Sequence, residues 1–69
     1  MTAPEKMQGF GLKALAHAAG KDLATIYRWR NALKSGRSIR DEAKHVLIAA
    51  TAGSAHAISW ADFFRGAQR

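Results

Sequence analysis

Every carboxylate of this chain stands where a helix would begin, and this placement limits the fold more than any other feature. Three of the five acids, Glu5, Asp41 and Asp62, each follow a hydroxyl residue by three positions. The hydroxyl residues are Thr2, Ser38 and Ser59. In such a capping box the hydroxyl caps one free backbone N–H of the first helical turn, and the acid can bond another. Asp22 is expected to be an N-cap itself, and Glu42 places negative charge in a first turn, where the helix dipole favours it. We therefore interpret all five acids as helix-capping residues and do not expect them to act as general acids or bases.

These caps and the glycines between them divide the chain into short helices. We expect helices at residues 3–8, 12–19, 23–33, 39–51 and 60–65. The fourth carries an apolar stripe at helical spacing, from Ile39 through Val46 to Ala50. Polar and apolar residues alternate over residues 56–60, so this segment is expected to form either a short strand or a loop. The expected fold is an all-α compact bundle of about five short helices, forming a single domain over residues 1–69.

Size and charge narrow the function. A chain of 69 residues without cysteine has a small core and no disulfide, so helix packing or self-association must stabilise it. Its net charge of +6 favours a polyanionic partner, nucleic acid first and an anionic membrane surface second. The longest apolar stretch, residues 46–50, is too short to span a bilayer, and the first residues lack the apolar region of a signal peptide. We expect a cytoplasmic protein.

The second and third expected helices are joined by a tight turn at residues 20–22. Gly20 suits a left-handed turn that residues with a Cβ resist, and Ala16 is small where two helices would cross closely. Four apolar residues would fix the crossing: Leu15, Ala19, Ile26 and Trp29. Residues 12–31 therefore have the pattern of a helix-turn-helix, whose second helix projects from the body and can enter a major groove.

Residues 20–30, Gly-Lys-Asp-Leu-Ala-Thr-Ile-Tyr-Arg-Trp-Arg, resemble the turn and recognition helix of the Cro-like repressors of phages and prophages. The Thr-Ala-Gly at residues 51–53 and the aromatic segment after it are similar to all-helical Cro proteins, and the resemblance covers residues 2–65. It implies a lambda-repressor-like fold that binds double-stranded DNA as a homodimer. The family usually has Val or Ile where Lys21 stands. An inward-turned Leu23 would replace that apolar contact and change the pitch of the recognition helix.

Matched onto the family's window, the front of the third helix supplies the side chains that read bases. These are Asp22, Leu23, Ala24, Tyr27, Arg28 and Asn31. Arg28 is the strongest candidate, because arginine can grip a guanine through O6 and N7. Ala24, and Leu23 if it points outward, could touch a thymine methyl group. The alternatives are that Tyr27 packs half-buried against the second helix and that Leu23 belongs to the core.

Basic residues follow one another from Arg28 to Arg40 with no acid between them. We expect phosphate contacts from Lys13, Lys21, Arg30, Lys34, Arg37 and Arg40. The alternative is an ordinary solvated basic face. Lys13 stands at the start of the second helix, whose free N–H groups favour an anion. Residues 9–11, Gly-Phe-Gly, either let the backbone approach DNA there or form a flexible connector.

Large apolar residues near the end of the chain exceed what one short terminal helix usually buries. They are Ile58, Trp60, Phe63 and Phe64. Some would close the core over the fourth helix, and the remainder would form a twofold dimer contact as in Cro-type repressors. His17, His45 and His56 are too scattered for a metal site, so we expect no metal and no cofactor.

The sequence therefore predicts a transcriptional repressor that binds a pseudo-palindromic operator as a homodimer and blocks promoter access. We expect no small-molecule ligand, no membrane partner and no enzymatic activity. One alternative keeps the same fold in an antitoxin or a phage-encoded inhibitor that acts mainly through a protein partner. A basic membrane-surface protein is the other, and the helix caps and the core stripe argue against it.

Overall fold

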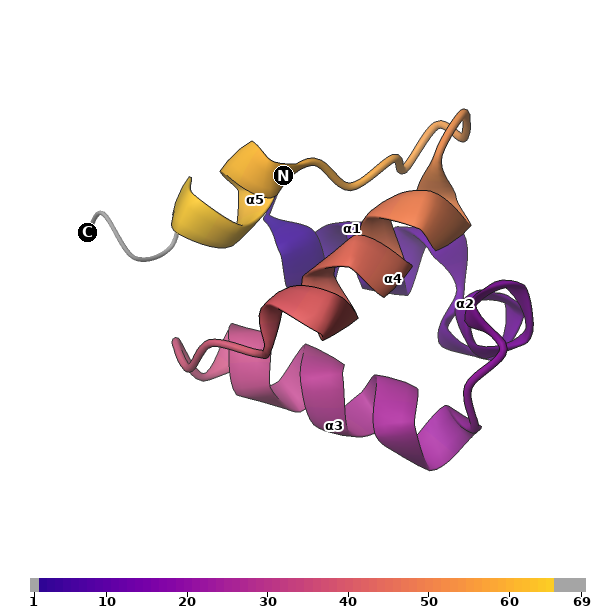
Figure 1. Ribbon diagram of the computed structural model, residues 1–69, viewed down its shortest axis with the longest axis horizontal. Helices are drawn as coiled ribbons and strands as arrows, with labels where there is room; N and C mark the ends of the chain where they lie inside the picture. Colours follow the sequence, from indigo (N-terminus) through magenta and orange to yellow (C-terminus); the bar gives the residue numbers. More distant parts are fainter. Residues whose placement is uncertain (1, 66–69) are drawn as a thin grey trace.

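Five helices follow one another along the chain, and residues 2–65 are described by the computed structural model (Figure 1). They are α1 (Ala3–Phe10), α2 (Leu12–Ala19), α3 (Leu23–Lys34), α4 (Asp41–Thr51) and α5 (Trp60–Arg65). The side-chain surroundings are described as far as Phe63. No strand occurs in residues 2–65, so the all-α expectation is confirmed. Residues 57–59 are an irregular segment before α5, and a strand there is wrong.

Each of the first four helices contributes one large apolar side chain that is fully buried in a common core. These side chains are Met7 from α1, Leu15 from α2, Ile26 from α3 and Leu47 from α4. Ile58, from the segment before α5, is 3% exposed and closes the core from the other end. Apolar side chains at helical spacing thus bring the helices together around one centre, as the stripe on α4 indicated.

The acids occupy the helix starts, and the capping box expected between Thr2 and Glu5 is confirmed. Glu5 accepts a hydrogen bond from the Thr2 amide at 2.8 Å, and Asp62 accepts one from the Ser59 amide at 2.8 Å. Each also accepts its partner's hydroxyl, at 3.0 and 3.2 Å. These contacts satisfy N–H groups that the first turn of a helix cannot bond internally.

The third capping box is not formed. Helix α4 begins at Asp41 with Arg40 as its N-cap, two residues later than expected, and Ser38 is exposed. Residue 40 is extended (φ −64°, ψ 152°), and Ile39 before it packs against the core. The need to bury Ile39 thus keeps residues 38–40 out of the helix. Asp41 instead pairs with Lys44 one turn on, at 3.5 Å.

Helix α1 continues two residues beyond the expected end. Gly9 and Phe10 are helical, so a flexible connector at residues 9–11 is wrong. The chain turns at Gly11, whose φ of 101° suits glycine, and the Gly11 amide bonds the Met7 carbonyl at 3.1 Å. Gly9 has a different role: a Cβ there would lie 2.5 Å from the ring of His56. The missing side chain lets the loop after α4 lie directly on α1.

Thr51 fastens that loop to α4. Its fully buried hydroxyl donates to the Leu47 carbonyl at 2.8 Å and accepts the Ile58 amide at 2.9 Å. The Ser54 hydroxyl caps the Thr51 carbonyl at 2.8 Å. These bonds bring Ile58 back over the core and set the position of α5. No helix in residues 2–65 has both the length and the apolar character that crossing a membrane requires.

Candidate nucleic-acid interface

Helix α3 lies along one side of the molecule and packs against α1 and α2 (Figure 1). Ile26 is its one fully buried residue, and Trp29 and Leu33 are partly buried against the core. These three positions share a face at helical spacing. The opposite face, which carries Ala24 and Arg28, is exposed to solvent. The helix is thus held by a narrow apolar stripe, and its opposite face is open to solvent.

The connection from α2 to α3 matches the tight turn expected from the sequence. Gly20 has the left-handed conformation (φ 68°, ψ 29°), and the Lys21 amide bonds the Ala16 carbonyl at 3.0 Å. Ala16 is 7% exposed and Leu15 is fully buried. Ala19 and Trp29 pack against the same core, as predicted. A left-handed glycine after the last helical residue ends α2 and sets the direction in which the chain leaves it.

All the residues expected to read bases lie on the exposed face of α3 or at its start. The exposed row consists of Asp22, Leu23, Ala24, Tyr27, Arg28 and Asn31. Leu23 is 38% exposed, so its assignment to the core is wrong. Leu23 stands three positions before Ile26, but it is the first residue of α3, beside the exposed residues 20–22, and does not join the side chains that pack against the core. Tyr27 is 42% exposed, so part of its ring is open to solvent, and half-buried packing against α2 stays an alternative to a base contact.

Two local interactions order this row. Asp22 is the N-cap of α3 and accepts a hydrogen bond from the Thr25 hydroxyl. That bond lowers the pKa of Asp22 below its ordinary value, and the nearby positive charge of Arg28 acts in the same direction. The guanidinium of Arg30 lies 5.6 Å from the centre of the Tyr27 ring, within cation–π range. The row therefore carries one negative charge at its beginning, on Asp22, and one positive charge further along, on Arg28.

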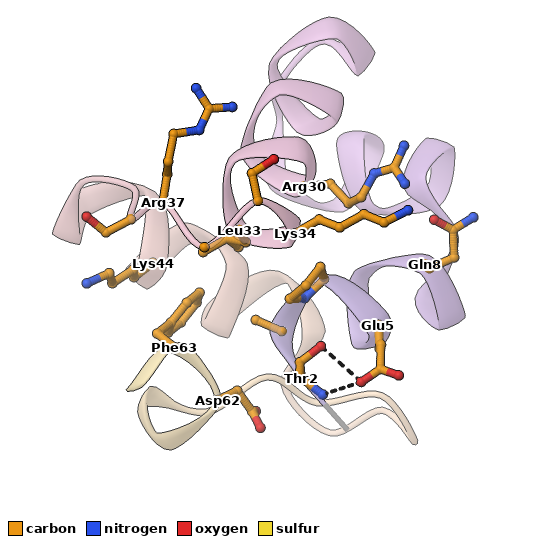
Figure 2. A pocket seen from close by; sticks show the side chains of 15 residues that line it. Thr2, Glu5, Gln8, Arg30, Leu33, Lys34, Arg37, Lys44, Asp62 and Phe63 are labelled. Carbon is orange, nitrogen blue, oxygen red and sulfur yellow. Dashed lines mark hydrogen bonds between the residues drawn. The ribbon is translucent and has the colours of Figure 1, made fainter. Parts of the chain in front are cut away.

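Five of the six predicted phosphate ligands lie on the two sides of the row, in two open grooves. The α3–α5 groove lies between α1, the end of α3, residues 35–38 and α5; it measures about 800 Å³, and Arg30, Lys34 and Arg37 line it (Figure 2). The α3–α4 groove measures about 500 Å³ and is lined in part by Lys21, Arg28 and Arg40. Lys13 is exposed on α2 and lines neither groove. Within the described residues, none of these cations is paired with a carboxylate.

The expected dimer residues are not on one common surface. Ile58 is 3% exposed and belongs to the core, so it is not available to a second copy. Phe63 is partly buried against that core, whereas Trp60 is 38% exposed. The side chain of Phe64 lies outside the described part of the chain. Ile58 was misplaced because the Thr51 hydroxyl, 7 positions earlier, binds its amide and turns it inward.

The three histidines lie in separate parts of the molecule. His45 meets the ring of Trp60 edge to face, with centroids 4.8 Å apart. His56 lies on Gly9, and His17 is exposed near the end of α2. Among the described residues no three metal-binding side chains come together.

Reasoning from the sequence missed the lining of the α3–α5 groove. Gln8, Lys44 and Phe63 join Arg30 and Lys34 there, although they come from four different helices (Figure 2). No local pattern identifies such residues, because only the packing of α1 and α5 beside α3 brings them together.

Comparison with known proteins adds no assignment. No protein-family model matches the chain, and neither a curated protein nor a solved structure is significantly similar to it.

Proposed function

We propose that this protein is a sequence-specific DNA-binding transcriptional repressor in which α2, the turn at Gly20 and α3 act as a helix-turn-helix. The observation that carries the proposal is the exposed row of α3 with unpaired cations on both of its sides. A helix is about 10–12 Å across with its side chains, and the major groove is about 12 Å wide. Helix α3 therefore fits the groove, and its row would face the base edges.

The cations on either side of the row would then meet the two sugar-phosphate strands. Arg30 and Lys34 line one groove, and Lys21 and Arg40 line the other, so that each side of α3 carries positive charge. Phosphate contacts of this kind hold a protein in register without reading sequence. Bases would be read by the row itself, with Arg28 on a guanine and Ala24 against a thymine methyl group.

Repression would follow from occupancy of promoter DNA. Two copies bound about a twofold axis would place their α3 helices one DNA turn apart, about 34 Å, on a pseudo-palindromic operator. Of the side chains expected to form the dimer contact, Trp60 offers described exposed surface. The protein would need no chemistry of its own.

The test is selection of bound duplexes from a random pool at about 150 mM salt, a concentration at which nonspecific phosphate binding is weak. We expect enrichment of an inverted repeat. Binding to the selected duplex, followed by fluorescence anisotropy at several salt concentrations, should weaken steeply as salt rises. Recovery of no preferred sequence would contradict the proposal and favour the protein-binding alternative.

A further inference from the structure

The α3–α5 groove has an apolar lining that binding of a phosphate chain does not require. Beside its cations it is lined by the apolar side chains of Pro4, Leu33 and Phe63 (Figure 2). Leu33 and Phe63 are only partly buried by the protein's own core. A sugar-phosphate backbone would bind the cations and leave this apolar surface uncovered, whereas a peptide side chain can cover it.

The unbalanced charge of this groove is positive. Its carboxylates are outnumbered: Asp62 is paired with Lys6 at 2.8 Å, and Glu5 shares the lining with three cations, Arg30, Lys34 and Arg37. Arg30 and Lys34 have no carboxylate partner within the described residues. Arg30 Nε is moreover shielded from solvent without a hydrogen-bond acceptor, which is an unfavourable state for a charged donor.

We propose that the α3–α5 groove binds an acidic peptide segment of a partner protein. One leucine-sized or aromatic side chain of the peptide would lie against Leu33 and Phe63. Its carboxylates would pair with Arg30 and Lys34, since a carboxylate can take two parallel hydrogen bonds from a guanidinium. A second copy of this chain does not fit, because its net charge is +6 and its five acids stand at helix starts.

Such a peptide would also regulate the proposed function, and this part of the inference rests on that function. Arg30 and Lys34 belong at once to the groove and to the phosphate-binding side of α3. A bound acidic segment would neutralise them and place negative charge beside the DNA. Peptide and operator would therefore compete, without any change in the shape of the protein.

Peptide binding is tested directly with the full chain and no DNA. The probe is a short fluorescein-labelled peptide with one leucine flanked by aspartates and glutamates, and anisotropy is measured at about 150 mM salt. We expect saturable binding that Lys34→Glu weakens about tenfold, because one attraction is replaced by a repulsion. Lys13→Glu makes the same change in net charge outside the groove and should leave the affinity within about twofold. Circular dichroism establishes that both variants are folded.

Two results would overturn the proposal. One is the absence of saturable binding. The other is an equal loss of peptide affinity in both variants, which would mean that the peptide is attracted only by the net charge of the protein. A peptide with serine in place of leucine should bind distinctly more weakly, and equal binding would rule out the apolar contact with Leu33 and Phe63. Competition is then measured by adding the peptide to the protein bound to its selected duplex. If no duplex is bound, the repressor proposal fails while the peptide titration still decides the groove.

Discussion

Lys6 and Asp62 tie the first helix to the last. Nζ of Lys6 lies 2.8 Å from Oδ2 of Asp62, and the same ammonium donates to the Ala57 carbonyl at 3.1 Å. The Asp62 side chain is 2% exposed. Burial acts to raise its pKa, but the hydrogen bonds from Lys6 and Ser59 and the charge of Lys6 outweigh burial, so that the pKa of Asp62 lies below its ordinary value of 3.8. The ionised carboxylate thus holds α5 against α1.

The first prediction is that Asp62→Asn lowers the free energy of unfolding at pH 7 by about 1–3 kcal/mol, because charged hydrogen bonds to a buried group are lost. Since the folded pKa of Asp62 is lowered, its stabilisation is present above about pH 4 and is lost as the pH falls through the folded pKa. Urea unfolding at about pH 7 and about pH 2.5 should show that the difference in free energy of unfolding between wild type and variant is smaller in acid. A difference that persists undiminished at low pH would contradict this account. Asp41→Asn is the control: the Asp41 side chain is 82% exposed and lies 3.5 Å from Lys44, so the variant should cost less than about 1 kcal/mol.

Thr51→Val should destabilise the fold by about 1–3 kcal/mol, although it conserves shape. Valine cannot accept a hydrogen bond from the buried Ile58 amide, which would be left without a partner. Thr51→Ser keeps the hydroxyl and should lose less. Chemical denaturation measures the free energy of unfolding of the two variants. Equal stability of Thr51→Val and Thr51→Ser would show that the hydroxyl does not hold the loop.

Gly9→Ala tests the contact between α1 and His56. Alanine in a helix is more favourable than glycine by about 1 kcal/mol, but its Cβ would collide with the His56 ring. We therefore expect little gain or a loss of stability from Gly9→Ala in the wild type, and a gain of about 1 kcal/mol when His56→Ala is already present. Thermal unfolding of the four members of this cycle measures the coupling. Additive effects would mean that the ring moves aside at no cost.

Arg28→Ala and Arg37→Ala should weaken DNA binding in different ways. Arg28 lies in the exposed row, so its loss should relax the preference at one base position by about 1–3 kcal/mol. Arg37 lines the α3–α5 groove, and its loss should weaken all sequences alike and reduce the salt dependence by about one phosphate. Binding of each variant to the selected duplex and to single-base changes distinguishes the two outcomes. Identical profiles would refute the division into reading and anchoring residues.

Elements that depend on neighbours in the chain could be predicted closely. The bounds of α2 and α5, the left-handed turn at Gly20 and the acids at the starts of α1 and α5 agree with expectation. Caps, glycine turns and helical periodicity act within a few residues, so the local sequence contains all that they need. The outward position of Arg28 follows from the same periodicity.

Features that depend on distant partners could not be read in this way. Ser38 lost its capping role because Ile39 is drawn into the core, and Ile58 is turned inward by a hydroxyl on α4. The α3–α5 groove exists only where α1 and α5 pack beside the end of α3. Local hydrogen bonding therefore sets where each helix begins and ends, while burial of apolar surface, which acts between any segments that can meet, decides which side chains share a groove.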